Sequence, residues 1–147
     1  MTLNNIWVFA QVANGAPTSA TLELLTKARS LSSNVTAIIG GDGASAAALG
    51  EFGATKVYAI NHGASLPGVA IAAALKSVID GGDTPDLIMF PQNYEGRDVM
   101  SRLSVKLDKT VITNNIDITD GGDGVTVVTP IFGGNTVVST TFTGAGP

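Results

Sequence analysis

The side chains best suited to binding a charged ligand lie in residues 90–97, Phe-Pro-Gln-Asn-Tyr-Glu-Gly-Arg. This segment follows a short apolar run and precedes a helix predicted for residues 96–107. In an open parallel sheet, ligands bind beyond the carboxyl ends of the strands, where the strand order reverses. Asn93 can cap the helix, Gly96 keeps its first turn open, and Arg97 can meet an anion above the exposed N–H groups.

The other wall of this crevice is predicted from residues 12–15, which follow the first apolar strand. The candidate ligand-binding residues at this switch point are Asn14, Gly41, Gln92, Asn93, Gly96 and Arg97. A simpler interpretation pairs Arg97 with Glu95, Asp98 or another nearby carboxylate on a solvated helix end. The residues alone favour that simpler interpretation over a ligand site.

The string Gly41-Asp-Gly43-Ala-Ser-Ala46 matches the G-x-G-x-x-A form of the dinucleotide-binding fingerprint. It follows the second predicted strand, however, and the next strand ends in Asn61 and His62 where that fingerprint needs an acidic residue. The pattern therefore favours a tight strand-to-helix turn, with Asp42 close to a helix N-terminus.

Composition excludes several chemistries. The chain has no cysteine, so disulfides and thiolate sites are excluded, and His62 is its one histidine, so no catalytic triad or histidine-rich metal site is expected. Acidic residues are scattered singly, and we predict neither catalytic nor metal-binding residues. The net charge is −4 without a basic stripe, which argues against nucleic acid as a partner.

No apolar run approaches the roughly 20 residues of a membrane span, and the start of the chain lacks the basic segment of a signal peptide. We therefore expect no membrane insertion and a cytoplasmic location of the bacterial type, or the mitochondrial matrix in a eukaryote.

Apolar runs and helical patterns alternate over the first two-thirds of the chain. Strands are predicted at residues 6–12, 35–39, 56–60 and 87–90. Helices are predicted at residues 19–31, 44–52, 67–80 and 96–107. Continuous apolar strands between helices indicate an α/β fold, a doubly wound, Rossmann-like parallel sheet with strand order 3-2-1-4-5 and helices on both faces.

The last third of the chain is rich in β-branched residues and lacks helical periodicity. It predicts an antiparallel meander with a turn at residues 120–124 and strands at residues 110–114, 116–119, 125–130 and 136–142. We expect one domain over residues 1–143 and an interdomain linker stub at residues 144–147.

Four segments in this order resemble one family. They are Ile6-Trp-Val-Phe-Ala10, Phe52-Gly-Ala-Thr-Lys-Val57, Glu95-Gly-Arg-Asp98 with Arg102, and Phe132-Gly-Gly-Asn135. The chain resembles the N-terminal domain of the α subunit of electron transfer flavoprotein over nearly its whole length, and most specifically over residues 94–142. Residues 109–115 depart from the family, which is commonly more acidic there.

The resemblance implies a fold like that of the adenine nucleotide α-hydrolases and a role without a catalytic site. Such α subunits pair with a β subunit into a heterodimer that carries FAD, mainly in a C-terminal domain absent here, while AMP binds the partner β subunit. The heterodimer passes electrons from flavin dehydrogenases, such as the acyl-CoA dehydrogenases of fatty acid β-oxidation, to a quinone oxidoreductase. This domain would then be a scaffold that forms the heterodimer interface, with no FAD of its own and an empty crevice.

Two other classes share the fold. A stand-alone adenine-nucleotide-binding module of the universal-stress type needs a glycine-rich phosphate loop after the fourth strand, where residues 91–96 hold one glycine. An enzyme of the nucleotide α-hydrolase group needs a phosphate motif after the first strand, and residues 11–17 make a poor one. If the scaffold interpretation holds, the surface that meets the β subunit is apolar, and the isolated domain is expected to self-associate.

Overall fold

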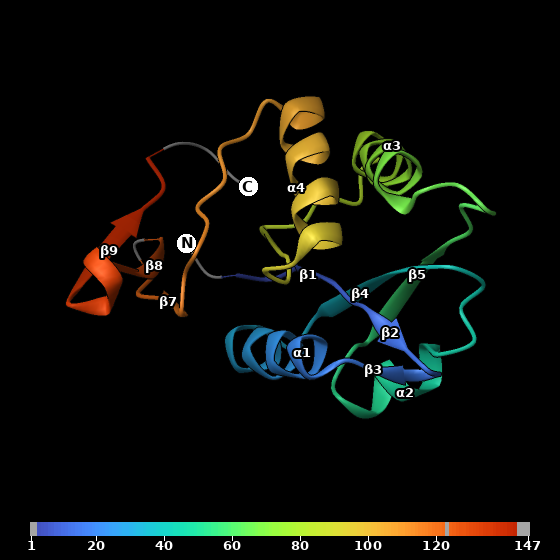
Figure 1. The fold of residues 1–147 in the computed structure, drawn as a ribbon, viewed down its shortest axis with the longest axis horizontal. Coiled ribbons are helices and arrows are strands. Elements are labelled where there is room, and N and C mark those ends of the chain that lie inside the picture. Colours follow the sequence, from blue (N-terminus) through green and yellow to red (C-terminus); the bar gives the residue numbers. More distant parts are fainter. Residues whose placement is uncertain (1–2, 123, 144–147) are drawn as a thin grey trace.

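The structure is a computed structural model that describes residues 3–122 and 124–143. A parallel sheet of order β5-β4-β1-β6 forms the centre, and an antiparallel sheet of order β7-β8-β9 stands to one side of it (Figure 1). The parallel strands are β1 (Ile6–Phe9), β4 (Val35–Gly40), β5 (Lys56–Ile60) and β6 (Leu87–Met89). The predicted α/β class is confirmed, and the order of these four strands is the predicted 3-2-1-4.

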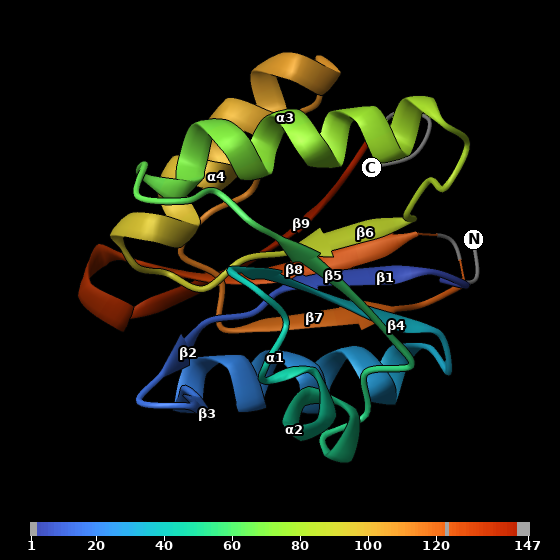
Figure 2. The same cartoon turned by 90° about the vertical axis from the view of Figure 1, so that its right-hand side faces the viewer.

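The helices form one layer on each face of the parallel sheet (Figure 2). They are α1 (Ser19–Leu31), α2 (Ala46–Glu51), α3 (Pro67–Asp80) and α4 (Tyr94–Leu107). The bounds predicted for α1 and α3 are confirmed. The helix predicted at residues 96–107 begins two residues earlier, at Tyr94, directly after its N-cap Asn93.

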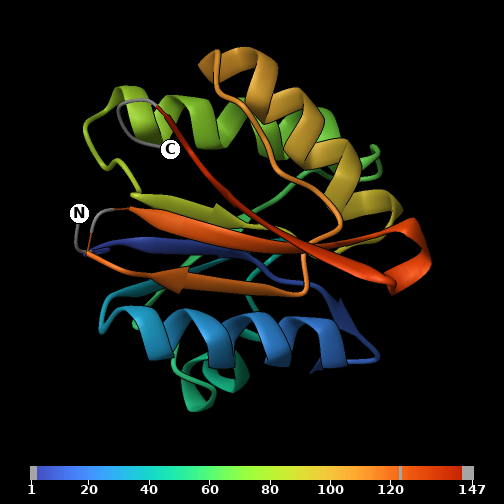
Figure 3. The same cartoon turned by 90° about the vertical axis from the view of Figure 1, so that its left-hand side faces the viewer.

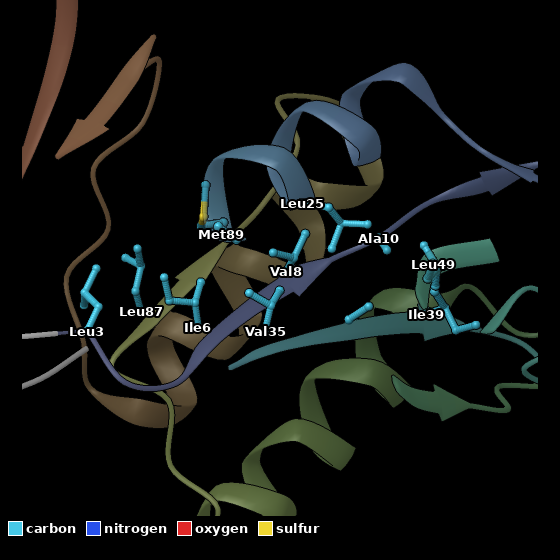
Figure 4. Packing of buried hydrophobic residues seen from close by; sticks show 12 residues of the cluster. Leu3, Ile6, Val8, Ala10, Leu25, Val35, Ile39, Leu49, Leu87 and Met89 are labelled. Carbon is cyan, nitrogen blue, oxygen red and sulfur yellow. The ribbon is translucent and has the colours of Figure 1, made fainter. Parts of the chain in front are cut away.

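Strand β1 is the centre of the core, and all four of its residues are buried. Ile6 and Val8 face α1 and pack with Leu25 and Val35 (Figure 4). Trp7 and Phe9 face the other helix layer and pack with residues of α3 and α4. Burial on both faces explains why the strand is continuously apolar, and Trp7 is a fully buried core residue.

The antiparallel sheet, called the meander below, consists of β7 (Asp117–Asp120), β8 (Val125–Ile131) and β9 (Thr136–Thr141) (Figure 3). The short helix η1 (Phe132–Gly134) connects β8 to β9. The predicted meander is confirmed, although Asp123 of its turn and the predicted linker at residues 144–147 lie outside the described residues. Where a loop was expected after β1, the strands β2 (Val12–Ala13) and β3 (Ala16–Pro17) form a small hairpin.

The strand predicted at residues 110–114 is wrong, since that segment is irregular. Asp108 ends α4 in the left-handed conformation, and Asn114 has φ 59°, so the β-branched residues between them find no partner strand. The meander accordingly has three strands within the described residues, where four were predicted. The fifth strand predicted for the parallel sheet is also not found there, since that sheet has four strands within the described residues.

Two carboxylates join the meander to the core. Asp117 of β7 forms an ion pair with Lys27 of α1, with 2.6 Å between Oδ1 and Nζ. Asp120 accepts hydrogen bonds from the backbone N–H of Gly122, at 2.9 Å, and of Leu3, at 3.1 Å. These bonds hold the pKa of Asp120 below its usual value, with the Gly122 bond as the larger cause.

A third carboxylate, Asp83, joins α3 to the edge strand β5. It accepts hydrogen bonds from Lys56 Nζ at 2.6 Å, from the Tyr58 hydroxyl, and from Asn5 Nδ2 at 3.2 Å. The bond from Lys56 is the main cause that lowers the pKa of Asp83, and Asp83 in turn raises the pKa of Lys56.

The Asp83→Asn substitution is expected to lower the free energy of unfolding by about 1 kcal/mol at pH 7, the upper range for a partly exposed ion pair. A carboxyl whose pKa is depressed by folding stabilises the protein above its unfolded pKa of about 3.9, and loses that effect as the pH falls through its folded value. The difference in the free energy of unfolding between the unsubstituted chain and Asp83→Asn should therefore shrink between about pH 5 and pH 2, as measured by urea titrations.

Asp80→Asn is the control, because Asp80 is exposed and, within the described residues, forms its ion pair with Lys76 of the same helix, one turn away. Two results would contradict this account. One is a loss of free energy of unfolding in Asp83→Asn that stays constant down to pH 2, and the other is a loss that equals the loss in Asp80→Asn.

Candidate functional site

The crevice beyond the carboxyl ends of β1 and β6 is occupied by three polar side chains. Gln11, just after β1, donates from Nε2 to Glu95 Oε2 at 2.9 Å. Its Oε1 accepts a hydrogen bond from Asn93 Nδ2. Gln11, Asn93 and Glu95, called the Gln11 network below, thus link the end of β1 to the start of α4.

Asn93 caps α4, as predicted. Its backbone is extended, and its Oδ1 accepts the N–H of Gly96 at 2.9 Å. Glu95 places a carboxylate in the first turn, which the positive end of the helix dipole favours. The same carboxylate opposes a phosphate at this helix end, because two negative charges would then compete for the same N–H groups.

Gly96 is required for a different reason from the one expected. It is buried, and a Cβ built on it would lie 2.2 Å from the carbonyl oxygen of Pro91. The expectation that Gly96 keeps the first turn open is therefore wrong. Gly96 allows the start of α4 to pack directly on the backbone that leaves β6.

Arg97 is exposed, and its guanidinium donates to Gln92 Oε1 from Nε at 3.2 Å and from Nη2 at 3.0 Å. The alternative that Arg97 pairs with Glu95 or Asp98 is wrong, since Glu95 binds Gln11 and Asp98 binds Arg102 Nε at 2.8 Å. Within the described residues, the Arg97 guanidinium thus lies at the rim of the crevice, where it is hydrogen-bonded to the side-chain amide of Gln92.

Asn14 and Gly41 lie on other loops, and no hydrogen bond joins either to the Gln11 network within the described residues. Asn14 is exposed at the tip of the β2–β3 hairpin with φ 53°. Gly41 follows β4 with φ 112°, and Asp42 Oδ1 accepts the N–H of Ala44 at 3.0 Å. This confirms a tight turn before α2.

The structure therefore brings together four of the six candidates, Gln92, Asn93, Gly96 and Arg97. Sequence reasoning missed Gln11, whose signal was a single amide directly after five buried residues. His62 Nδ1 lies 2.8 Å from the carbonyl oxygen of Ser65 in the loop before α3. Over residues 3–122 and 124–143, no three histidine or acidic side chains gather in a way that would hold a metal ion.

A cavity of about 680 Å³ lies beside β6, between the parallel sheet and the meander. It reaches Gln92 and Asn93 beyond the end of β6, but its remaining lining is mostly apolar and comes from α1, α4, residues 109–118 and β8. This cavity therefore lies beside the sheet, whereas Gln11, Asn93 and Glu95 bond to one another across the crevice where nucleotides bind such folds.

The fold and the position of the crevice define a Rossmann-like α/β domain with a switch-point crevice at the ends of β1 and β6. The family model described as electron transfer flavoprotein domain matches residues 6–147. A curated protein, electron transfer flavoprotein subunit alpha of Syntrophomonas wolfei subsp. wolfei (strain DSM 2245B / Goettingen), is 30% identical over 124 residues. The chain belongs to the electron transfer flavoprotein family, as an N-terminal domain of the α-subunit type.

The match covers 81% of this chain and 39% of that relative, so the chain spans well under half of the relative's length. Membership gives the chain a role in a family of electron-carrying flavoproteins. No helix in the described part of the chain is long and apolar enough to cross a membrane.

The Gly96→Ala substitution is expected to destabilise the domain by about 1–3 kcal/mol, because the added methyl group meets the Pro91 carbonyl and must displace backbone. The higher helix propensity of alanine offsets only part of this cost. Urea unfolding followed by far-UV circular dichroism measures the difference.

Gly50→Ala is the matched control, because Gly50 also lies in a helix, α2, and a Cβ there would meet nothing within 4 Å. It should stabilise the domain by about 0.5–1 kcal/mol. Equal effects of the two substitutions would show that the contact between Gly96 and Pro91 does not constrain the helix start.

Proposed function

We propose that this domain is the scaffold of an electron-carrying α subunit and forms the heterodimer interface with a β subunit. In this proposal FAD is bound by the full-length heterodimer outside this domain, and AMP is bound by the partner subunit. The complex passes electrons from flavin dehydrogenases, such as those of fatty acid β-oxidation, to a quinone oxidoreductase. The domain itself catalyses nothing and works in the cytoplasm, or in the mitochondrial matrix of a eukaryote.

The exposed apolar surface of the meander carries this proposal. All six residues of β9 are exposed, including Val137 at 55% and Val138 at 38%. Phe132, in the turn before β9, is 78% exposed. Apolar side chains gathered on one projecting element of a domain indicate a protein–protein interface.

The backbone of β9 supports the same conclusion. Within the described residues β9 pairs only with β8, so its other edge carries free N–H and C=O groups. A six-residue edge strand without a charged residue or proline is open to pairing with another chain. We assign this edge and Phe132 to the β subunit, and its exposure in the isolated domain accounts for the self-association that we expect.

Phe132→Asp and Val138→Asp are each expected to weaken binding to the β subunit at least tenfold, because each puts a charge into an apolar interface. A tenfold change in Kd corresponds to about 1.4 kcal/mol, which is ordinary for a central interface residue. Titration calorimetry with the purified β subunit measures the Kd.

Leu66→Asp is the matched control, since Leu66 is an exposed leucine, at 84%, in the loop before α3 and away from the meander. Binding that survives both meander substitutions but is lost in Leu66→Asp would move the interface to the α3 side and refute the assignment.

The competing proposal is an adenine-nucleotide-binding module, and the exposed guanidinium of Arg97 is the observation in its favour. The Gln11 network weighs against it, because Gln11 and Glu95 occupy the crevice and Glu95 repels phosphate. We therefore expect the isolated chain to be colourless and to bind AMP or ATP no more tightly than millimolar in equilibrium titrations.

A one-to-one endpoint at micromolar AMP or ATP that is lost in Arg97→Gln would favour the nucleotide module. Gln92→Ala is the control, because it frees the guanidinium from its amide partner without removing the charge. Flavin absorbance near-stoichiometric with the isolated chain would instead contradict the location of FAD outside this domain.

A further inference from the structure

The one Asn-Gly pair of the chain, Asn14-Gly15, lies at the tip of the β2–β3 hairpin, which projects beside the start of α1 (Figure 2). Ala13 and Ala16 are the last paired residues, so Asn14 and Gly15 form a two-residue turn. Both have a positive φ, 53° and 77°, as the favoured turn of such hairpins requires, and Asn-Gly is the pair that this turn prefers. The turn explains why these two residues stand here, but the same two residues can also react with each other.

The Asn14 side chain is exposed, and within the described residues no hydrogen bond holds it. By contrast, the side chain of Asn93 caps α4. Residues 13–16 are all exposed, and a Cβ built on Gly15 would meet no atom within 4 Å. The side-chain amide of Asn14 is therefore accessible to the backbone nitrogen of the residue that follows it.

The hairpin is short enough to open. In its left-handed turn the backbone nitrogen of Gly15 is held away from the Asn14 side chain, so the two react only while the turn is open. Two residue pairs join β2 to β3, and Pro17, in one of them, has no N–H to donate. A two-stranded hairpin is at best marginally stable by itself, and exposed tips open far more often than a core does.

We propose that Asn14 is a site of spontaneous deamidation. The backbone nitrogen of Gly15 attacks Cγ of Asn14, and the new C–N bond closes a succinimide ring. The side-chain nitrogen of Asn14 leaves as ammonia and takes the proton from the Gly15 nitrogen. Water from the solvent then breaks the new ring at one of its two carbonyl carbons, which gives either aspartate or isoaspartate. Glycine favours the first step because it has no Cβ to block the approach of its nitrogen.

Both products change the hairpin. Each adds one carboxylate, and one added negative charge takes the formal net charge from −4 to −5. Aspartate keeps the length of the backbone and tolerates a positive φ, so it retains the turn. Isoaspartate adds a backbone carbon atom, which a two-residue turn does not accommodate, so the pairing of β2 with β3 is lost.

The change stops at Gln11, because two threonines hold its backbone. The Gln11 N–H donates to Thr21 Oγ1 at 2.7 Å, and its carbonyl oxygen accepts the Thr21 hydroxyl at 3.0 Å and the Thr18 N–H at 3.0 Å. Thr21 is fully buried, so these bonds belong to the core and not to the hairpin. Deamidation therefore alters the loop beyond β1 and leaves the Gln11 network in place.

The test follows deamidation of the purified, folded chain by peptide mass spectrometry at neutral and at mildly alkaline pH. Asn114 is the internal control, because it is exposed and has φ 59°, but is followed by Asn115, which carries a Cβ. Asn14 should convert at least tenfold faster than Asn114. Its conversion should be faster at the higher pH, because the attacking nitrogen must lose its proton. Equal conversion at the two positions would overturn the proposal.

Gly15→Ala should slow conversion at Asn14 at least tenfold, because its Cβ blocks the attacking nitrogen. Gly63→Ala is the matched control, since Gly63 also has a positive φ, 61°, and open space around it, and it should leave the rate at Asn14 unchanged. A Gly15→Ala chain that converts as fast as the unsubstituted chain would contradict the mechanism. The comparison of Asn14 with Asn114 needs no substitution and holds even if a variant fails to fold.

Ion-exchange chromatography separates the products by their added charge, and methylation by protein isoaspartyl methyltransferase identifies the isoaspartate fraction. Hydrogen exchange in that fraction should be at least tenfold faster over residues 12–17 and unchanged over residues 6–11. Faster exchange over residues 6–11 as well would contradict a change that stops at Gln11.

Discussion

The burial of β1 on both faces is the constraint on which the rest of the structure depends. Its four residues are fully buried and divide between two cores, so helices must cover both sides of the sheet. With β1 central between β4 and β6, the switch point falls where β1 and β6 end, and Gln11 and Asn93 are brought together from positions 82 residues apart. The crevice thus follows directly from the core.

Amide side chains bond to the polar groups of that crevice. Asn93 caps α4, Gln11 bonds to both Asn93 and Glu95, and Gly96 packs closely on the backbone of Pro91. Such a network stiffens the junction between β6 and α4. A rigid junction fits the scaffold role that we propose for this domain.

The two ends of the fold differ in how their sheets are covered. The meander presents an uncovered strand edge, because β9 pairs only with β8 within the described residues and all six of its residues are exposed, Val137 and Val138 among them. The parallel sheet instead lies between helices, and the cavity beside β6 is lined by residues of α1, α4 and the segment 109–118. An uncharged, exposed edge such as that of β9 is open to pairing with another chain.

The sequence by itself determined the features that depend on local periodicity and on residue chemistry. It predicted the bounds of α1 and α3 and the Asn93 cap, because each is carried by residues close together in the chain. It also predicted the order of four parallel strands, through the general rules of strand connection, and the family, through four short segments in a fixed order. Only the tertiary structure decided the partner of Arg97, the role of Gly96, the position of Gln11 and the failure of residues 110–114 to form a strand. Gln11 meets Asn93 and Glu95 across more than 80 residues, and a strand at residues 110–114 would need a partner strand from elsewhere in the fold. Arg97 and Gly96 meet Gln92 and Pro91, which are only five residues back, but the path of the backbone from β6 into α4 decides these contacts, and a residue pattern does not encode that path.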